Sequence, residues 1–511
     1  MGLLGLNRLM SIQREQRCRQ IEANRLLAST DKRKGSPCKQ DNSRCSKRER
    51  YSQPDLPEDI WRHIHSLLSL QDAACAACVS RAFLCLWRCR PHLTFSLQTL
   101  GLSEMACKKG GIARDYNKKV DRILKKHSGT GMKKFEIEFY GPSNANTYYH
   151  LNNWFEIAIT SGIEELTLRL TPDVTKYNFP CSLLSDGRGD LIQSLHLSHC
   201  SFRPTVEVVS LRSLTSLDLC LVRITDRELG ILLSNSLVLE KLGIKYCDKI
   251  NCLKIPCVLE RLSSLEVFEC YSLQMVESKA PNLCSFCFGG EQVQFSIGEP
   301  LQMKNLQVIF PNSISFGRAE LPFSMPNLET LNISSRCEMS HTPTAPGKFL
   351  HLRYLSITFA GWRFSRAYDY FSLVSFLDAS PLLETFILCI LQKGKHDLTL
   401  RDPIYPRQMS ERQHDRLKNV KINGFSSTKS LVELTCHILQ NTTSLECLTL
   451  DTTRIEFRCS DSSVDVCLPS DRDAIKGAHK ALLAIRTYIE GIVPATVKFS
   501  VLEPCRRCYA W

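Results

Sequence analysis

The sequence of 511 residues contains no apolar run of the roughly 18 residues that a membrane-spanning helix requires. The apolar start MGLLGLNRLM is too short for a secretory signal peptide and is interrupted by Arg8. Leu6 occupies the position at which N-myristoylation requires Ser or Thr. The sequence therefore predicts a protein without a membrane partner.

The common catalytic motifs are also missing. The sequence has no GxxxxGK(S/T) loop, no GxGxxG after a strand, no HExxH and no GxSxG. The thirteen histidines are scattered, and the one cluster, His196, His199 and Cys200, lies at the end of a predicted strand, where alternate residues face opposite ways. We expect no catalytic residue, no metal and no cofactor, so the chain is predicted to be a binding protein and not an enzyme.

Acidic residues are scarce in residues 1–50, which hold thirteen Lys or Arg and five Asp or Glu. This segment carries most of the chain's net charge of +13 and has no sustained apolar period, so it is predicted to be a disordered basic leader. Basic charge confined to a tail, with aromatic residues at 8% and not interleaved with it, argues against a specific nucleic-acid partner.

Two basic clusters in the leader are separated by twelve residues, a spacing that resembles a bipartite nuclear import signal. A solvated basic linker is an equally good interpretation, and a transit peptide is a third. The sequence thus favours the nucleus, with the cytoplasm as the alternative. The import candidates are Lys32, Arg33, Lys34, Lys47, Arg48 and Arg50.

Twenty-five cysteines without a secretory signal are expected to be reduced thiols. Three CxxC pairs occur, and none is followed by a second pair or by histidines at a zinc-site spacing. Cys75 and Cys78 are expected to be small core residues of a helical unit, and Cys284 and Cys287 to lie on opposite faces of a strand. The third pair, Cys505 and Cys508, falls in a tail, and the hypothesis that these two thiols are reactive stays open.

Residues 51–98 have the pattern of three short helices. Asp55 is a suitable N-cap and Pro57 suits a first helical turn. Apolar residues then recur at helical spacing from Ile60 through Leu68. Asp72 can cap a second helix and Ser80 a third. A unit of this size needs a partner or the following chain for stability.

This segment resembles the F-box, the adaptor-docking motif of ubiquitin ligase receptor subunits. The matching residues are Leu56-Pro57, Ile60, Ile64, Leu67-Leu68, Leu70, Asp72, Val79-Ser80-Arg81 and Trp87. Two features depart from the family pattern. The usual Leu-Pro before the acidic cap is Leu67-Leu68-Ser69-Leu70, and the usual tryptophan position holds Phe83, with Trp87 one turn later.

The resemblance implies docking on a Skp-type adaptor and, through it, on a cullin. It assigns the adaptor interface to the apolar residues of the motif, and Phe83 and Trp87 could belong either to the interface or to the core. The implied adaptor-binding residues are Leu56, Pro57, Ile60, Ile64, Leu68, Leu70, Val79, Phe83 and Trp87.

Residues 132–460 repeat the template apolar-x-x-apolar-x-apolar, mostly every 21 to 31 residues, which is the leucine-rich-repeat signature. Each copy supplies a strand that can bury its apolar side only against neighbouring copies. Cys200, Cys247 and Cys270 follow central leucines at the Asn/Cys offset and are predicted core residues. The copies are 132–137, 163–168, 192–197, 214–219, 239–244, 262–267, 283–288, 328–333, 352–357, 383–388, 417–422 and 445–450, with a weaker one at 306–311.

The segments around the repeats differ in character. Residues 99–131 are a predicted helical connector, and the polar segment 393–415 is a predicted insertion. Residues 461–511 are predicted to cap the array with a helix opened by Asp471 or Asp473 and an alternating strand, followed by a tail. The expected fold class is α/β: a three-helix F-box unit, a solenoid with a curved β-sheet and a helix–strand cap. This layout also resembles plant F-box/leucine-rich-repeat proteins.

The domain order implies a substrate-recognition subunit of an SCF-type ubiquitin ligase, in which the repeats bind an unidentified target protein and the partner subunits perform catalysis. A repeat scaffold that binds proteins without recruiting a ligase is the alternative. A small-molecule receptor with a pocket on the inner face of the solenoid is a third hypothesis, although no polar cluster indicates it.

Overall fold

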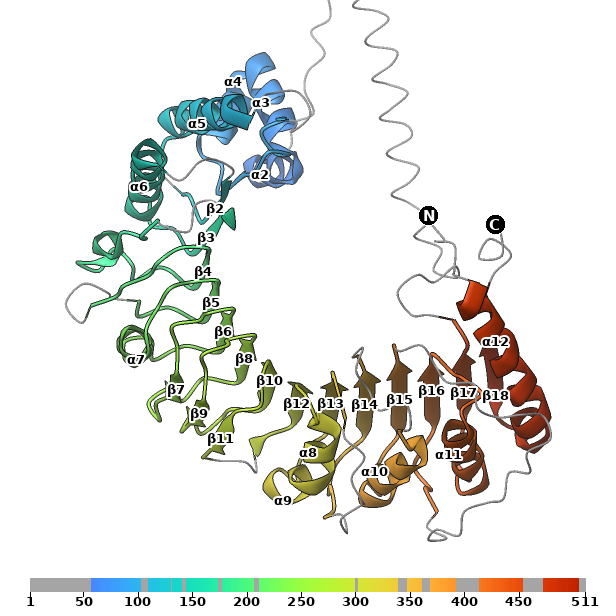
Figure 1. Cartoon of the computed structure of the whole chain (residues 1–511). Helices are drawn as coiled ribbons and strands as arrows, with labels where there is room; N and C mark the ends of the chain where they lie inside the picture. Colours follow the sequence, from blue (N-terminus) through green and yellow to red (C-terminus); the bar gives the residue numbers. More distant parts are fainter. Residues whose placement is uncertain are drawn as a thin grey trace, which may run out of the picture. The chain divides into compact units, whose positions relative to one another are not determined.

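A computed structural model describes most of the chain from Pro57 onward (Figure 1). The described residues are 57–102, 109–129, 131–139, 144–172, 177–205, 211–298, 302–338, 347–360, 368–391, 413–453 and 472–504. The candidate import residues, Leu56, most of the predicted insertion and the Cys505/Cys508 pair lie outside these ranges. No helix within these ranges combines the length and apolarity that crossing a bilayer requires.

One parallel sheet organises the solenoid, and fifteen strands belong to it within the described ranges. Every predicted repeat copy coincides with one strand, which confirms the repeat pattern and the fold class. The sheet also contains a strand that the template missed, β1, at a position before residue 132. In sheet order the strands are β1 (His92–Phe95), β2 (Lys134–Phe139), β3 (Glu165–Leu170), β4 (Ser194–Ser198), β5 (Ser216–Cys220), β6 (Lys241–Lys245), β8 (Ser264–Phe268), β10 (Ser285–Gly289), β12 (Asn305–Ile309), β13 (Thr330–Ser335), β14 (Tyr354–Phe359), β15 (Thr385–Ile390), β16 (Asn419–Asn423), β17 (Cys447–Asp451) and β18 (Lys498–Leu502).

The register of the sheet stacks equivalent residues of successive copies. Leu166 of β3 pairs with Leu195 of β4, which in turn pairs with Leu217 of β5. All three side chains are almost fully buried, while the residues between the apolar positions, such as Thr167, point to the other side of the sheet. Each copy therefore completes its core only with its neighbours, as expected for a repeat array.

The return segments form an outer layer of two kinds. Where central apolar residues follow one another at short spacing, the chain returns as a strand, and β7 (Cys252–Ile255), β9 (Met275–Ser278) and β11 (Gln294–Ile297) form a parallel sheet in the order β7-β9-β11 within the described ranges. Elsewhere the return segments are mostly helical. These helices are α6 (Ala145–Thr160), η2 (Cys181–Leu184), α7 (Asp226–Ser234), α8 (Ser313–Ala319), α9 (Leu321–Ser324), η4 (Tyr370–Leu373), α10 (Val374–Ala379) and α11 (Lys429–Gln440).

The predicted C-terminal cap is confirmed as a helix followed by a sheet strand. The helix α12 (Arg472–Ala484) continues through a π-helical turn, η5 (Ile485–Ile489), and a short 3₁₀ turn, η6 (Glu490–Ile492). Its predicted apolar stripe is buried from Ala478 to Ile489. The strand β18 then pairs with β17 and extends the sheet.

Within the residues described from Pro57 onward, three helices precede the sheet, as predicted: α2 (Glu58–Leu67), α3 (Leu70–Val79) and α4 (Arg81–Arg88). The predicted cap of the second helix is wrong. Ser69, not Asp72, is the N-cap, because its extended backbone lets its hydroxyl accept the Asp72 N–H at 3.1 Å. Ser80 is the N-cap of α4 as expected, although its hydroxyl makes no capping bond. Helix α5 (Lys109–Lys126) lies in the predicted connector.

The cysteines divide into core and surface groups. Cys200, Cys247 and Cys270 are buried as predicted, and burial raises the pKa of the Cys200 thiol to about 12, which keeps it protonated. The Cys247 thiol also donates to the Lys245 carbonyl oxygen at 3.3 Å. The expectation that Cys75 and Cys78 are core residues is wrong. Both are exposed, because α3 turns its Leu70 and Ala73 side inward instead.

Two buried histidines near the C-terminal end of the solenoid predict a loss of stability in acid. The rings of His414 and His437 lie 6.0 Å apart, facing Asp378 and Asp415. Burial, followed by the neighbouring His437, lowers the pKa of His414 from 6.5 to about 4, and burial also lowers the pKa of His437. The unfolded chain therefore binds more protons below pH 6.5, and folding stability falls as the pH drops from 6.5 towards 4.

We expect the free energy of unfolding to fall by about 2 kcal/mol between neutral pH and pH 4 through His414 alone. Urea denaturation across this pH range measures the slope. His414→Gln should remove part of that slope, whereas replacement of His351, which is exposed before β14, should leave it unchanged. A slope that is the same in both variants would rule out His414 as its source.

Candidate adaptor-docking surface

The apolar residues of the three N-terminal helices separate into an inner and an outer set. Leu70, Ala73 and Trp87 are 7%, 0% and 8% exposed and belong to the same core cluster as the solenoid. Half-buried Leu68 packs against that core. These residues join the helices to the rest of the fold.

The outer set is small and strongly exposed. Val79 is 84% exposed at the junction of α3 and α4, and Leu67 and Ile60 on α2 are 73% and 40% exposed. Ile60 and Leu67 are seven residues apart, so they share one face of α2. Pro57, next to α2, is also exposed. The apolar surface of these side chains is removed from water only when a partner covers it.

Phe83 occupies an intermediate position between α2 and α4. Its ring meets Trp61 edge to face, with centroids 5.5 Å apart, and stacks on His65 at 6.3 Å. It is half-buried, as is Ile64. The pKa of His65 is lowered first by burial and then by the charge of Arg90, which favours a neutral imidazole at this contact.

The predicted adaptor-binding residues divide between the core and the surface. Leu70 and Trp87 are core residues, because α3 and α4 turn them towards the first strands, and they offer almost no side-chain surface to a partner. Pro57, Ile60 and Val79 are exposed, whereas Ile64, Leu68 and Phe83 are half-buried. Leu67, which is not in the predicted set, is also exposed, and its seven-residue spacing from Ile60 is a signal that both lie on one face of α2.

Arg90 fixes this helical unit to the sheet, a role that the sequence did not reveal. Its buried guanidinium donates to the carbonyl oxygens of Leu68 at 2.7 Å, His65 at 3.2 Å and Ser66 at 3.5 Å. It also donates to the His92 carbonyl oxygen of β1 at 3.2 Å. One cation thus donates to carbonyl oxygens at the end of α2 and at the start of the sheet.

The connector after α5 reinforces the same junction. The backbone N–H of Ser128 donates to the Arg88 carbonyl oxygen at 2.9 Å. The Nε2 atom of His127 lies 3.0 Å from the carbonyl oxygen of Arg90. Burial lowers the pKa of His127, so the neutral tautomer that protonates Nε2 suits this contact. The three helices are consequently held from both sides.

Figure 1 shows the outer layer on one side of the main sheet. The opposite face carries charged pairs in its first half. His196 Nδ1 lies 3.0 Å from Asp218 Oδ2, and Lys245 Nζ lies 2.9 Å from Glu266 Oε2. Burial raises the pKa of Asp218, but the bond from His196 and nearby cations outweigh it, so the net shift is downward. Partly exposed pairs of this kind add little to the stability of the fold.

The predicted cluster of His196, His199 and Cys200 does not come together as a set of ligands. His196 points to Asp218, while Cys200 is buried in the core. Within the described ranges, no three His, Cys, Asp or Glu side chains are placed to hold a metal ion.

The fold and this surface define an F-box unit followed by a leucine-rich-repeat solenoid. Residues 54–93 match the F-box domain family, and residues 123–506 match the family described as At1g61320/AtMIF1, LRR domain. The second match covers most of the chain, which therefore belongs to the At1g61320/AtMIF1 leucine-rich-repeat family and is an F-box/leucine-rich-repeat protein of the plant type.

Two relatives from Arabidopsis thaliana support the same grouping. The putative F-box/LRR-repeat protein At5g02930 is 24% identical over 213 residues, which cover 42% of this chain and 41% of that protein. The F-box/LRR-repeat protein At3g03360 is 24% identical over 237 residues, or 45% of each chain. The chain thus spans less than half the length of either relative.

Proposed function

We propose that this protein is the substrate-recognition subunit of an SCF-type ubiquitin ligase. Its F-box helices dock on a Skp-type adaptor, which links them to a cullin, and its solenoid binds a target protein. The observation that carries the proposal is the exposed apolar set Ile60, Leu67 and Val79 on helices whose inner side chains pack into the core of the solenoid. The F-box family match supports the same role.

The face of the main sheet opposite the outer layer, called the open face below, is the proposed target-binding surface. Strand residues that do not enter the core point to this side in register, so a partner meets rows of side chains from successive repeats. The rows are charged around Asp218 and Lys245 and mostly uncharged and polar around Asn332 and Ser356. A target with both a charged and a neutral polar region fits this division.

Adaptor binding tests the proposal. Purified chain carrying Leu67→Asp and Val79→Asp should bind a Skp-type adaptor about 100-fold more weakly than wild type, because two buried carboxylates would replace two apolar contacts at the interface. The matched control is Leu191→Asp with Leu237→Asp, which places the same two charges on solenoid leucines that are 57% and 54% exposed and should leave affinity unchanged. Isothermal titration calorimetry measures both.

Equal adaptor affinity in wild type and double variant would contradict this docking surface. Absence of adaptor binding by the wild-type chain would instead favour a scaffold that works without a ligase. A third hypothesis, a small-molecule receptor on the open face, is supported by no polar cluster in the sequence.

A further inference from the structure

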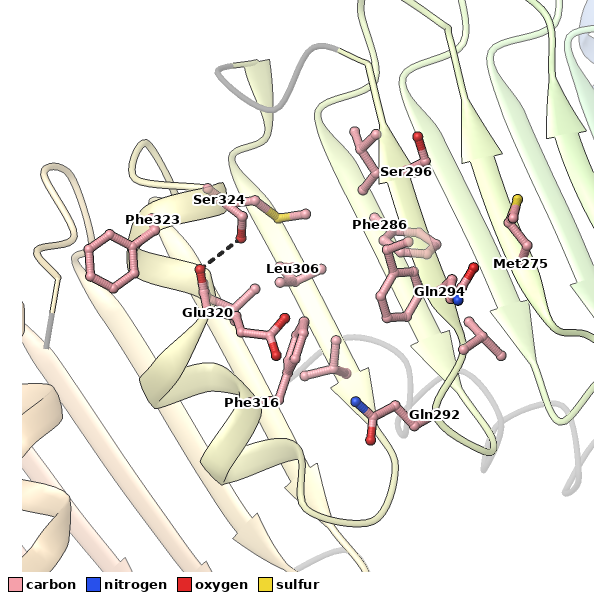
Figure 2. A pocket seen from close by; sticks show the side chains of 16 residues that line it. Met275, Phe286, Gln292, Gln294, Ser296, Leu306, Phe316, Glu320, Phe323 and Ser324 are labelled. Carbon is pink, nitrogen blue, oxygen red and sulfur yellow. Dashed lines mark hydrogen bonds between the residues drawn. The ribbon is translucent and has the colours of Figure 1, made fainter. Parts of the chain in front are cut away.

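The outer layer of the solenoid changes from strands to helices after β11, and the change leaves a cavity. Strands in a sheet repeat about every 4.8 Å, whereas packed helices need 8–10 Å. The return segment after β12 is built from α8 and α9, so it does not continue the outer sheet. A half-open cavity of about 800 Å³ lies between β11 and these two helices (Figure 2).

The floor and walls of this cavity are mainly apolar. Phe286, Leu306 and Val308 from β10 and β12 form the floor, and each is at most 2% exposed. Phe295 of β11 packs on Phe286 with ring centroids 5.7 Å apart and reaches Phe316 of α8 at 6.2 Å. The cavity is therefore a hydrophobic trough beside β11, and it is called the trough below.

One side of the trough is the free edge of a strand. The N–H groups of Gln294 and Gly298 donate to β9 and the residue before it, with bonds of 3.0 Å to the Gln274 oxygen and 2.8 Å to the Ser278 oxygen. Because backbone groups alternate along a strand, the N–H groups of Phe295 and Ile297 point away from β9, towards the trough. Within the described residues, β11 is the last strand of this sheet and no backbone group bonds to that edge.

The trough also has one sign of charge. Among its sixteen described lining residues, Glu320 is charged and none is Lys or Arg. Figure 2 shows the Glu320 carboxylate pointing from the helix side into the space that faces β11. Gln292, Gln294 and Ser296 supply neutral polar groups on the opposite side. An occupant with a basic side chain would complement the carboxylate.

We propose that an extended, basic peptide segment of a partner protein docks in this trough by adding a fourth strand to the outer sheet along β11. Its backbone pairs with the free groups of Phe295 and Ile297, and alternate apolar side chains cover Phe286 and Leu306. A Lys or Arg of the segment pairs with Glu320. A single strand is about 5 Å wide, which suits a gap that exists because one strand is missing. The site does not depend on adaptor docking by the F-box.

A synthetic peptide tests the proposal on the full chain. The probe is a fluorescein-labelled peptide of nine residues in which valine alternates with threonine, with lysine at both ends. We expect it to bind with a Kd below about 100 µM, measured by fluorescence anisotropy. A probe with N-methyl groups on alternate amides keeps its side chains but loses one row of donors, and should bind about tenfold more weakly.

Protein variants distinguish strand pairing from nonspecific hydrophobic binding of the peptide. Ile297→Pro removes an outward N–H at an edge that tolerates proline, so affinity should fall about tenfold while the unfolding temperature stays within about 2 °C. Glu320→Gln should weaken binding about threefold. Glu291→Gln is the matched control, because Glu291 is exposed but does not line the cavity, and it should have no effect.

Several outcomes would overturn the proposal. These are no binding of the probe at about 1 mM, equal affinity for the N-methylated probe, and affinity unchanged by Ile297→Pro. Should Ile297→Pro fail to fold, the N-methylated probe still decides the question on wild-type protein. Dimerisation of the wild-type chain that Ile297→Pro abolishes would show instead that a second copy occupies the edge.

Discussion

Arg90→Ala is expected to lower the free energy of unfolding by about 3–5 kcal/mol, the cost typical of removing one partner from a buried charged network. The substitution leaves the carbonyl oxygens of His65 and Leu68 without the guanidinium that now donates to them. It also removes the bond to His92 that joins α2 to the first described strand. Lysine at this position presents one ammonium group instead of a fork, so Arg90→Lys should recover only part of the loss.

Chemical denaturation, together with hydrogen exchange of the α2 amides, measures the Arg90 effect. Arg81→Ala is the control, because this exposed arginine lies only nine residues away on α4 and its loss should change stability by no more than about 0.5 kcal/mol. Exchange should accelerate first in α2 and α3. Equal destabilisation by the two variants would show that charge at this end of the chain, and not the Arg90 bonds, sets the stability.

Gly424→Ala is expected to cost about 3–5 kcal/mol, the sum of backbone strain and a steric clash. The residue follows β16 with φ +73°, a conformation that alanine adopts only with strain. A Cβ atom there would also overlap the carbonyl oxygen of Ile390, at the end of β15. Backbone cannot move aside as a flexible side chain could, so the two strands would have to separate locally.

A second glycine provides the comparison for Gly424. Gly131 has nearly the same backbone angle, φ +75°, but no atom of the described part of the chain lies within 4 Å of the position of an added Cβ. Gly131→Ala should therefore cost only the strain of about 1 kcal/mol. Urea denaturation of both variants isolates the clash with Ile390, and equal losses would mean that it relaxes without cost.

The repeat pattern predicted the main sheet well because the same positions must be buried in every copy, so one atypical residue does not obscure the pattern. A side chain such as Leu166 must be buried in every copy, so the template recurs at each strand. The template did not predict the short strand β1, because HLTF carries only two of the apolar positions and follows a helical segment. The outer strand β11 was not predicted either, since QFSI does not differ from other short alternating segments.

Which apolar side chains of the three N-terminal helices are exposed was predicted less well, and the reason is geometric. Leu67 and Leu68 are adjacent on a helix, about 100° apart around its axis, so either could face the partner. Only the packing of α3 against the first strands decides that Leu68 is turned inward and Leu67 outward. The role of Arg90 was equally hidden, because the sequence does not show which carbonyl groups at the end of α2 its guanidinium reaches.

The F-box helices pack directly on the first strand of the sheet, and this has a mechanical consequence for the proposed ligase. Trp87 and Leu70 share a core with β1, and Arg90 spans the joint, so adaptor and target would be carried on one stiff frame. A captured target would then present a fixed zone of its surface to the ubiquitin-carrying subunit. Selection among the lysines of the target would follow from distance along this frame and not from the chemistry around each lysine.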